Sequence, residues 1–144
     1  MADTGPETIL FDLFLTNQRR KAMIARALEG TGLPPEDYPF YVFVGAEGPW
    51  TPTGLAARLG IPLSTVLFRV RALERRGHAE RTPNPTDGRS FLIRLTDEGQ
   101  RLLAIARPAF RAHAEAVEAE LGATRVAKLR AELASLRDAI DGQR

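Results

Sequence analysis

Residues 51–95 contain two helical segments followed by a segment of alternating period, and this order constrains the fold more than any other feature. A short helix is predicted from Thr51 to Gly60, because a hydroxyl followed by proline favours a helix start and glycine favours a helix end. A second helix is predicted over residues 63–76, and a hairpin with a long, turn-rich tip over residues 78–95. The inward residues of the second helix are Val66, Val70 and Leu73.

This order of helix, turn, helix and hairpin is typical of a winged helix-turn-helix, in which the second helix enters a groove of DNA. Hydroxyls and arginines on the outward face of that helix can contact bases or phosphates, whereas Phe68 can offer only apolar contact. The outward face carries Ser64, Phe68, Arg71 and Arg75, flanked by Thr65 and Arg69.

Positive charge is concentrated in the same part of the sequence. The whole chain has a formal net charge of +2, but the segment from Arg58 to Arg94 contains eight arginines and three acidic residues. That segment therefore carries +5 and the remainder −3. A basic patch on a near-neutral protein favours a polyanionic partner, although a solvated, arginine-rich surface gives the same count.

Helices are predicted before the helix-turn-helix as well. A first helix is expected over residues 6–29, with Pro6 at its first position and Gly30 at its end. We interpret residues 33–47 as a helix rather than a buried strand, because the long helices around them leave a strand little to pair with.

Two more helices are predicted after the hairpin. Thr96 should cap a helix that runs to about Leu121 and kinks near Pro108, and Gly122 should separate it from a last helix. The last helix has an apolar seam of heptad spacing, which indicates a partner helix. We expect a homodimer whose interface includes Leu10, Leu13, Phe14, Val126, Leu129, Leu133, Leu136 and Ile140.

The predicted fold class is therefore mainly α with a small β-hairpin wing (α+β). Residues 1–144 should form a single domain, in which a winged helix-turn-helix lobe of about 33–96 is flanked by dimerisation helices of about 6–32 and 97–144.

Several classes of function are disfavoured. The chain has no cysteine, and His78 and His113 are far apart in sequence without ligand partners at metal-binding spacing, so we expect no metal and no cofactor. We find neither a glycine-rich phosphate loop nor a nucleophile elbow, and an enzyme is not expected. The N-terminal residues 1–7 do not resemble a secretory leader, and no apolar run could span a membrane, so the expected location is the cytoplasm.

Five segments together resemble the multiple-antibiotic-resistance regulator (MarR) family. They are Thr53-Gly54-Leu55-Ala56-Ala57-Arg58-Leu59-Gly60, Ser64-Thr65-Val66, Leu73-Glu74-Arg75-Arg76-Gly77, Asp87-Gly88-Arg89-Ser90 and Leu95-Thr96-Asp97-Glu98-Gly99. The resemblance extends over residues 51–99, and its most specific part is the Asp-x-Arg of the wing followed by Leu-Thr-x-x-Gly. Outside this range only the order of helices is similar.

The resemblance implies roles for residues of the wing and the second helix. Arg89 would enter the minor groove, and Asp87 would brace the wing by pairing with an arginine. One departure is that Leu67 and Phe68 stand where the family often has serine and arginine, which suggests an unusual sequence preference. The residues expected to contact DNA are Thr51, Thr53, Ser64, Thr65, Phe68, Arg69, Arg71, Arg75, Asp87 and Arg89.

The resemblance also implies a pocket for a small lipophilic or aromatic-acid effector between the dimerisation helices and the DNA-binding lobe. The aromatic side chains that could line it are Tyr38, Tyr41, Trp50 and His113, although for any single one of them we favour an ordinary core or boundary position.

The function favoured by the sequence is a ligand-responsive, homodimeric repressor that binds a palindromic operator. An alternative is a winged-helix protein that antagonises another regulator by binding it and does not bind DNA, which the apolar Leu67 and Phe68 would suit. A third class is the dimerisation module of a small-molecule methyltransferase, which we disfavour because these 144 residues include no cofactor-binding domain.

Overall fold

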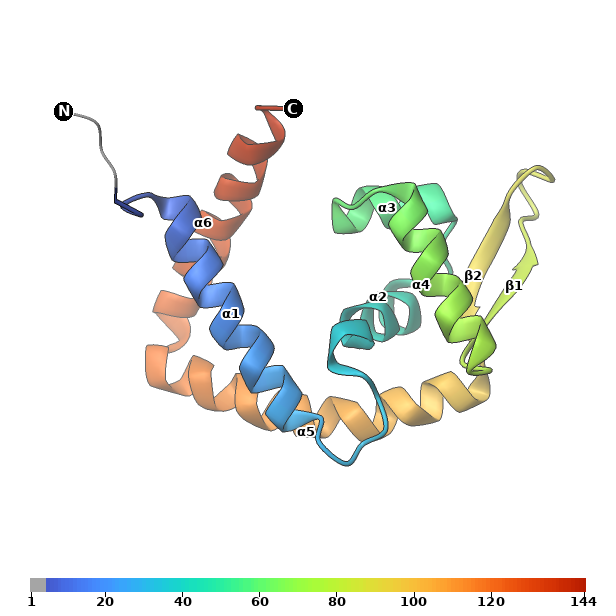
Figure 1. Cartoon of the computed structure of the whole chain (residues 1–144), viewed down its shortest axis with the longest axis horizontal. Helices are drawn as coiled ribbons and strands as arrows, with labels where there is room; N and C mark the ends of the chain where they lie inside the picture. The colour runs from blue at the N-terminus through green and yellow to red at the C-terminus, as the bar shows by residue number, and fades with distance from the viewer. Residues whose placement is uncertain (1–4) are drawn as a thin grey trace.

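The computed structural model describes residues 5–144 as helices with a small hairpin projecting at one edge (Figure 1). In chain order the elements are α1 (Ile9–Ala27), the 3-10 turn η1 (Pro35–Asp37), α2 (Tyr38–Glu47), α3 (Pro52–Leu59), α4 (Leu63–Arg75), β1 (Ala79–Pro83), β2 (Phe91–Leu95), α5 (Asp97–Leu121) and α6 (Ala123–Asp141). The predicted fold class is confirmed. The expectation about a leader rests on residues 1–7, of which 1–4 lie outside the described residues.

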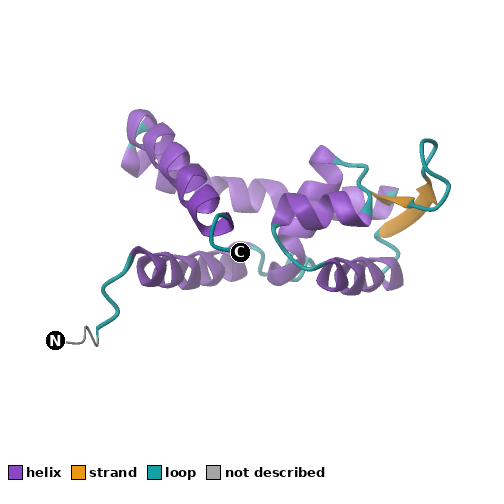
Figure 2. Cartoon of the chain, turned by 90° about the horizontal axis from the view of Figure 1, so that it is seen from above, coloured by secondary structure: helices purple, strands orange, loops and turns teal. Residues whose placement is uncertain are grey.

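Two regions rise over the two ends of α5, which runs along the base of the molecule in Figure 1. We call α1 and α6 the arm, and we call residues 35–95, which include η1, α2, α3, α4, β1, β2 and the tip of the hairpin, the lobe. In Figure 2 the hairpin projects at the end of the molecule opposite the arm. None of the described helices is long and apolar enough to cross a membrane.

The first helix begins three residues later than predicted. Pro6 is not its first residue, because Thr8 has an extended backbone and its Oγ1 accepts a hydrogen bond from the Phe11 N–H at 3.4 Å. The physical reason is that Thr8 offers a side-chain acceptor to the helix start, whereas the residue before Pro6 is Gly5, which has no side chain to do so.

The prediction of a helix over residues 33–47 is confirmed by η1 and α2. Helix α2 supplies the lobe with four buried residues, including Tyr38 and Tyr41. It crosses closely over α5 and β2 at Gly45, where an added Cβ would lie 2.7 Å from the Leu103 Cδ2 atom and 2.8 Å from the Leu95 Cδ1 atom. Only a residue without a side chain allows this close packing.

The helix-turn-helix is formed by α3 and α4 where the sequence predicts it. Pro52 begins α3 and Gly60 ends it with a left-handed φ of +66°, a conformation that glycine adopts without strain. The inward stripe of α4 is confirmed, since Val66, Val70 and Leu73 are all fully buried. Their burial against α3, α2 and the hairpin fixes the direction in which the opposite face of α4 points.

The hairpin pairs β1 and β2 in antiparallel register from Ala79↔Leu95 to Pro83↔Phe91. Sequence reasoning missed a third partner. Trp50 forms a bridge with Ile93, in which its N–H donates to the Ile93 carbonyl at 3.1 Å and its carbonyl accepts at 2.7 Å. This bridge fastens the start of the helix-turn-helix to the base of the wing.

The Leu-Thr-x-x-Gly segment joins α5 to the lobe, as predicted for Thr96. The Thr96 Oγ1 accepts from the Gly99 N–H at 3.1 Å and donates to the Gly77 carbonyl at 2.6 Å. Gly99 packs directly on the backbone of His78, so that a Cβ at this position would collide with the His78 carbonyl oxygen. The hydroxyl and the glycine therefore both hold the start of α5 against the end of α4 and the start of β1.

Candidate nucleic-acid interface

The first turn of the helix-turn-helix is held by Thr51. Its Oγ1 accepts a hydrogen bond from the Gly54 N–H at 3.0 Å, which caps α3. Thr51 is half-buried, whereas Thr53 is exposed in the first turn of α3. The structure therefore gives Thr51 a local structural role, and its predicted contact with DNA stays a prediction.

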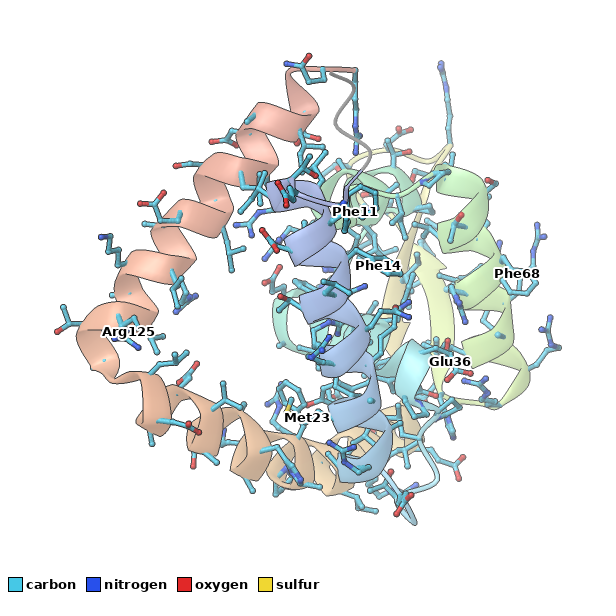
Figure 3. The ribbon with its side chains drawn as sticks, turned by 60° about the vertical axis from the view of Figure 1, so that its left-hand side comes forward. Phe11, Phe14, Met23, Glu36, Phe68 and Arg125 are labelled. Atoms are coloured by element: carbon cyan, nitrogen blue, oxygen red, sulfur yellow. The ribbon has the colours of Figure 1, made fainter. Side chains whose placement is uncertain are left out.

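The outward face of α4 is exposed as the helix geometry predicts. Ser64, Thr65, Phe68, Arg71 and Arg75 are all exposed, and Figure 3 shows Phe68 pointing away from the rest of the lobe. The helix is braced on its other side by a fully buried stripe, so this face can approach a groove without unfolding the lobe. These contacts with DNA remain predictions.

The tip of the wing is ordered by two short side-chain turns. Asn84 Oδ1 accepts hydrogen bonds from the backbone N–H and the hydroxyl of Thr86, and Asp87 Oδ1 accepts from the Arg89 N–H at 3.0 Å. The expected ion pair of Asp87 with an arginine is wrong for residues 5–144, because its carboxylate instead fixes the Arg89 backbone. Asp87 therefore shapes the tip, and the side chain of Arg89 is exposed there.

The eight arginines between residues 58 and 94 divide into two groups. Five are engaged by carboxylates within the lobe: Arg58 by Glu47, Arg69 and Arg76 by Asp37, Arg81 by Glu74, and Arg94 by Glu80. Within the described part of the chain, the side chains of Arg71, Arg75 and Arg89 have no ion pair and no hydrogen-bond partner. The arginines without an internal partner thus lie on the outward face of α4 and at the wing tip, and they occupy a smaller part of the surface than the sequence count indicated.

Asp37 is the residue of this region that sequence reasoning missed. It is only 1% exposed, and its two carboxylate oxygens bind Arg69 at 2.9 Å and Arg76 at 2.7 Å. Arg69 and Arg76 lie seven residues apart, two turns of the same helix, and this spacing is the signal that could have indicated a shared partner. Because Arg69 is committed to Asp37, the structure does not place it with the free cations of α4.

A cleft of about 470 Å³ lies between α1, α2 and α5. Three arginines surround it: Arg20 of α1, and Arg107 and Arg111 of α5. Its other lining residues are Ile24, Tyr38, Pro39, Val42, Phe43 and Phe110. The rings of Tyr38 and Phe110 are 5.0 Å apart. Burial raises the pKa of Tyr38, with Arg107 and Arg111 acting in the opposite direction, so its hydroxyl stays protonated near neutral pH.

Of the four aromatic residues predicted to line an effector pocket, only Tyr38 lies in this cleft. Tyr41 is fully buried beneath it, and its hydroxyl is 2.6 Å from the His78 Nδ1 atom. Trp50 donates its indole N–H to the Phe43 carbonyl, and His113 is exposed on α5. Tyr41, Trp50 and His113 therefore do not line this cleft, and their predicted contact with an effector stays a prediction.

Apolar side chains on the arm are exposed, in contrast to those of the lobe. The N-terminal half of α1 exposes Leu10, Leu13 and Phe14, and no residue of α6 is buried within the described chain. Leu129 and Leu133 of the predicted seam are each 43% exposed, while Val126, Leu136 and Ile140 are half-buried. Figure 3 shows Phe11 and Phe14 near the free end of α1.

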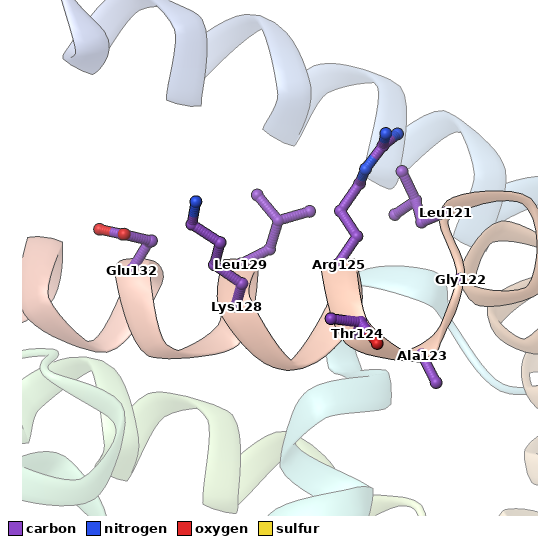
Figure 4. A pocket seen from close by; sticks show the side chains of 8 residues that line it. All are labelled: Leu121, Gly122, Ala123, Thr124, Arg125, Lys128, Leu129 and Glu132. Atoms are coloured by element: carbon purple, nitrogen blue, oxygen red, sulfur yellow. The ribbon is translucent and has the colours of Figure 1, made fainter.

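The turn between α5 and α6 is hollowed on its surface. A cleft of about 600 Å³ is lined there by Leu121, Gly122, Ala123, Thr124, Arg125, Lys128, Leu129 and Glu132. In Figure 4 the side chains of Leu121, Arg125 and Leu129 rise on one side of the helix, while Ala123 points to the opposite side. Among residues 5–144 there is no group of His, Asp and Glu side chains that could hold a metal ion.

Comparison with known proteins identifies the family. The MarR family model matches residues 31–90. A probable transcriptional regulator from Pseudomonas aeruginosa is 30% identical, with a TM-score of 0.77 over 90% of this chain and 97% of that chain. The repressor CouR bound to a 23-mer DNA duplex is 26% identical, with a TM-score of 0.79 over 95% and 99% of the two chains.

CouR from Rhodococcus jostii RHA1 bound to p-coumaroyl-CoA is 28% identical, with a TM-score of 0.76 over 93% of this chain and 95% of that chain. None of the curated protein sequences matches the chain significantly. The matches to solved structures cover 90% or more of this chain, and so they extend over both the lobe and the arm. The chain belongs to the MarR family of winged helix-turn-helix transcriptional regulators, which bind DNA and are not enzymes.

Proposed function

We propose that the chain is a ligand-responsive repressor that binds a palindromic operator as a homodimer. The observation that carries the proposal is the position of Arg71, Arg75 and Arg89, the three arginines of the lobe that lack a carboxylate partner within residues 5–144. They lie on α4 and at the wing tip, the two places from which a winged helix-turn-helix meets the major and minor grooves. The similar repressor CouR has been solved on a DNA duplex.

The homodimer is supported by the exposed apolar residues of the arm. Burying a leucine or phenylalanine side chain is worth about 1.5–3 kcal/mol, and α1 and α6 leave many of them in water in a single chain. In this proposal residues of about 6–32 and 97–144 form the dimer and residues of about 33–96 bind DNA. Two-fold symmetry then requires two half-sites about one helical turn apart. The proposed location of the protein is the cytoplasm.

Responsiveness to a ligand is supported by the cleft between α1, α2 and α5. Its aromatic walls and its three arginines suit a flat anionic molecule, such as an aromatic carboxylate, because guanidinium groups bind carboxylates through charge-assisted hydrogen bonds. CouR, a relative of similar fold, binds p-coumaroyl-CoA.

Asp37 provides a physical connection between this cleft and the DNA-binding helix. It directly precedes Tyr38, which lines the cleft. Its carboxylate binds Arg69 in the middle of α4 and Arg76 just after the last residue of α4. A neighbouring cleft of about 460 Å³ shares Arg20, Ile24 and Pro39 and is lined by Arg69 as well. A ligand that displaces α2 at Tyr38 therefore also displaces an anchor of α4.

DNA binding is tested by a gel-shift assay with DNA from upstream of the gene itself. We compare wild type with a variant that lacks the three free arginines (Arg71→Ala, Arg75→Ala and Arg89→Ala). The matched control lacks three paired arginines (Arg58→Ala, Arg81→Ala and Arg94→Ala), which changes the net charge equally. The free-arginine variant should lose most of its affinity, at about 1–3 kcal/mol per contact, and the control should retain it. Binding by neither wild type nor control would favour the protein-antagonist alternative.

The ligand is tested in the same assay with benzoate as the simplest aromatic carboxylate and benzamide as its neutral analogue. We expect benzoate to release the DNA at concentrations at which benzamide does not, because only the carboxylate can bind the arginines of the cleft. Arg107→Ala should weaken the response to benzoate without changing the affinity for DNA in its absence. Equal effects of benzoate and benzamide would show that charge does not determine binding in the cleft.

A further inference from the structure

Phe68 is an anomaly on the outward face of α4. It is 62% exposed, while its neighbours on the same face are the hydroxyl of Ser64 and the free guanidinium groups of Arg71 and Arg75. Figure 3 shows the side chain directed into solvent. No part of the lobe core includes it, so folding does not explain a phenyl ring at this position.

Other phenylalanines at the surface of the lobe are covered. The guanidinium of Arg58 lies 4.7 Å from the centre of the Phe43 ring, and that of Arg81 lies 4.4 Å from the centre of the Phe91 ring. Phe68 has no such cover among residues 5–144, even though arginines stand near it on the same helix. Its ring is therefore available to a partner molecule, and the partner must approach the face that carries the free arginines.

We propose that Phe68 recognises the C5-methyl group of a pyrimidine in the major groove, and that it thereby sets part of the sequence preference. This inference rests on the proposed function, in which α4 enters that groove. A phenyl ring has no donor or acceptor, and the only apolar group on the major-groove edges of the four bases is the methyl of thymine. A 5-methylcytosine places the same methyl group at the same position of the ring, so methylated cytosine is a second source of the same chemistry.

The position of Phe68 along the helix suits this role. Arg75 lies about 20° around the helix from Phe68 and about 10 Å further along it, and Arg71 lies about 60° away on the same face. The arginines can thus bind phosphates towards one end of α4, while Phe68 in the middle of the helix meets base edges. Arg71 and Arg75 contribute affinity for the DNA backbone, and the Phe68 ring between Ser64 and these arginines discriminates between bases.

The experiment uses duplexes that the full-length wild-type protein selects from a random pool. Each thymine of a selected duplex is replaced in turn by deoxyuridine, which removes only the methyl group. We expect loss of the methyl group at one or two positions in each half-site to weaken wild-type binding about three- to fivefold, which is the effect of burying one methyl group. Phe68→Ala should bind the thymine and deoxyuridine duplexes equally at those positions.

Two further variants separate reading of the methyl group from a general loss of apolar surface. Ile105→Ala truncates an apolar residue of α5 that is 60% exposed, nearly the same fraction as Phe68, and it should keep the wild-type response to deoxyuridine. Phe68→Arg introduces a side chain that bonds guanine edges, and it should select guanine at the same position.

A second set of duplexes carries cytosine or 5-methylcytosine at the sensitive position. Tighter binding of wild type, but not of Phe68→Ala, to the methylated duplex would show that the ring reads the methyl group on either base. If wild type binds every deoxyuridine duplex as tightly as its thymine counterpart, the inference is overturned while DNA binding by the free arginines stands. If no duplex is selected from the pool, both the inference and the proposed function fall.

Discussion

The lobe and the arm expose opposite kinds of chemistry, although the same chain builds both. The lobe buries the apolar stripe of α4, which consists of Val66, Val70 and Leu73. It leaves three arginines without partners within residues 5–144. The arm does the reverse, because α1 and α6 expose leucines and phenylalanines that the single chain does not cover. Each surface is incomplete in a way that favours one kind of partner: a polyanion for the lobe, and, as proposed for the dimer, a second copy of the chain for the arm.

The difference between the lobe and the arm also shows that the number of charged or apolar residues in a segment does not give the surface available to a partner. Counting arginines along residues 58–94 overstated the free basic surface, since five of the eight are paired with four carboxylates of the lobe itself, Asp37 being shared by two of them. Charges without an internal partner are the most available for contact with phosphate, which releases counterions from the DNA. In the same way, only the apolar residues outside the shared core can drive association between chains.

The largest expected effect comes from placing a charge in the seam of the arm. Leu133→Asp should weaken the dimer by several kcal/mol, at least about a hundredfold in dissociation constant, because an unpaired carboxylate would be buried between helices. Ser135→Asp is the control, since it adds the same charge to the exposed side of α6 about 200° away. Light scattering at micromolar concentration measures both. A wild-type protein that is monomeric under these conditions would refute the role given to the arm.

A smaller effect is expected from breaking ion pairs of the lobe, and the buried pairs should cost more than an exposed one. Asp37→Asn should lower the free energy of unfolding by about 2 kcal/mol, because it removes the carboxylate that binds Arg69 and Arg76. The loss is limited because both guanidinium groups are about a third exposed to water. Glu47→Gln, which breaks the exposed pair with Arg58, should cost less than about 1 kcal/mol.

Urea denaturation at a fixed protomer concentration compares the two variants, because dimer formation makes apparent stability depend on concentration. Equal and small losses in both would mean that the Asp37 contacts do not hold α4. In that case the proposed connection between the cleft and the DNA-binding helix would be removed as well.

What the sequence could predict was determined by local signals. The Thr51 and Thr96 caps, the Gly60 end of α3 and the inward stripe of α4 each depend on residues within a few positions of one another, and all are confirmed. The predicted end of α1 at Gly30 is not confirmed, because the helix ends at Ala27. The start of α1 was predicted three residues too early because Pro6 and Thr8 both carry start signals, and the hydroxyl cap at Thr8 prevails.

The remaining features depend on contacts between distant segments. Asp37 lies 32 and 39 residues from its two arginine partners, and the bridge between Trp50 and Ile93 joins segments 43 residues apart. The aromatic residues that line the cleft depend on the same kind of contact, since the Tyr41 hydroxyl pairs with His78 and the Trp50 indole with the Phe43 carbonyl. Such partners are chosen by tertiary packing, for which one sequence carries no periodic signal.

The salt dependence of DNA binding tests most directly the claim that only the unpartnered arginines of the lobe meet DNA. Three per protomer make six in a dimer, and the slope of log affinity against log salt should fall by about 0.9 for each phosphate contact removed. The variant with Arg71→Ala, Arg75→Ala and Arg89→Ala should therefore have a slope shallower than wild type by up to about 5. The control with Arg58→Ala, Arg81→Ala and Arg94→Ala should keep the wild-type slope. Equal slopes for the two variants would contradict the claim, because net charge alone would then determine binding.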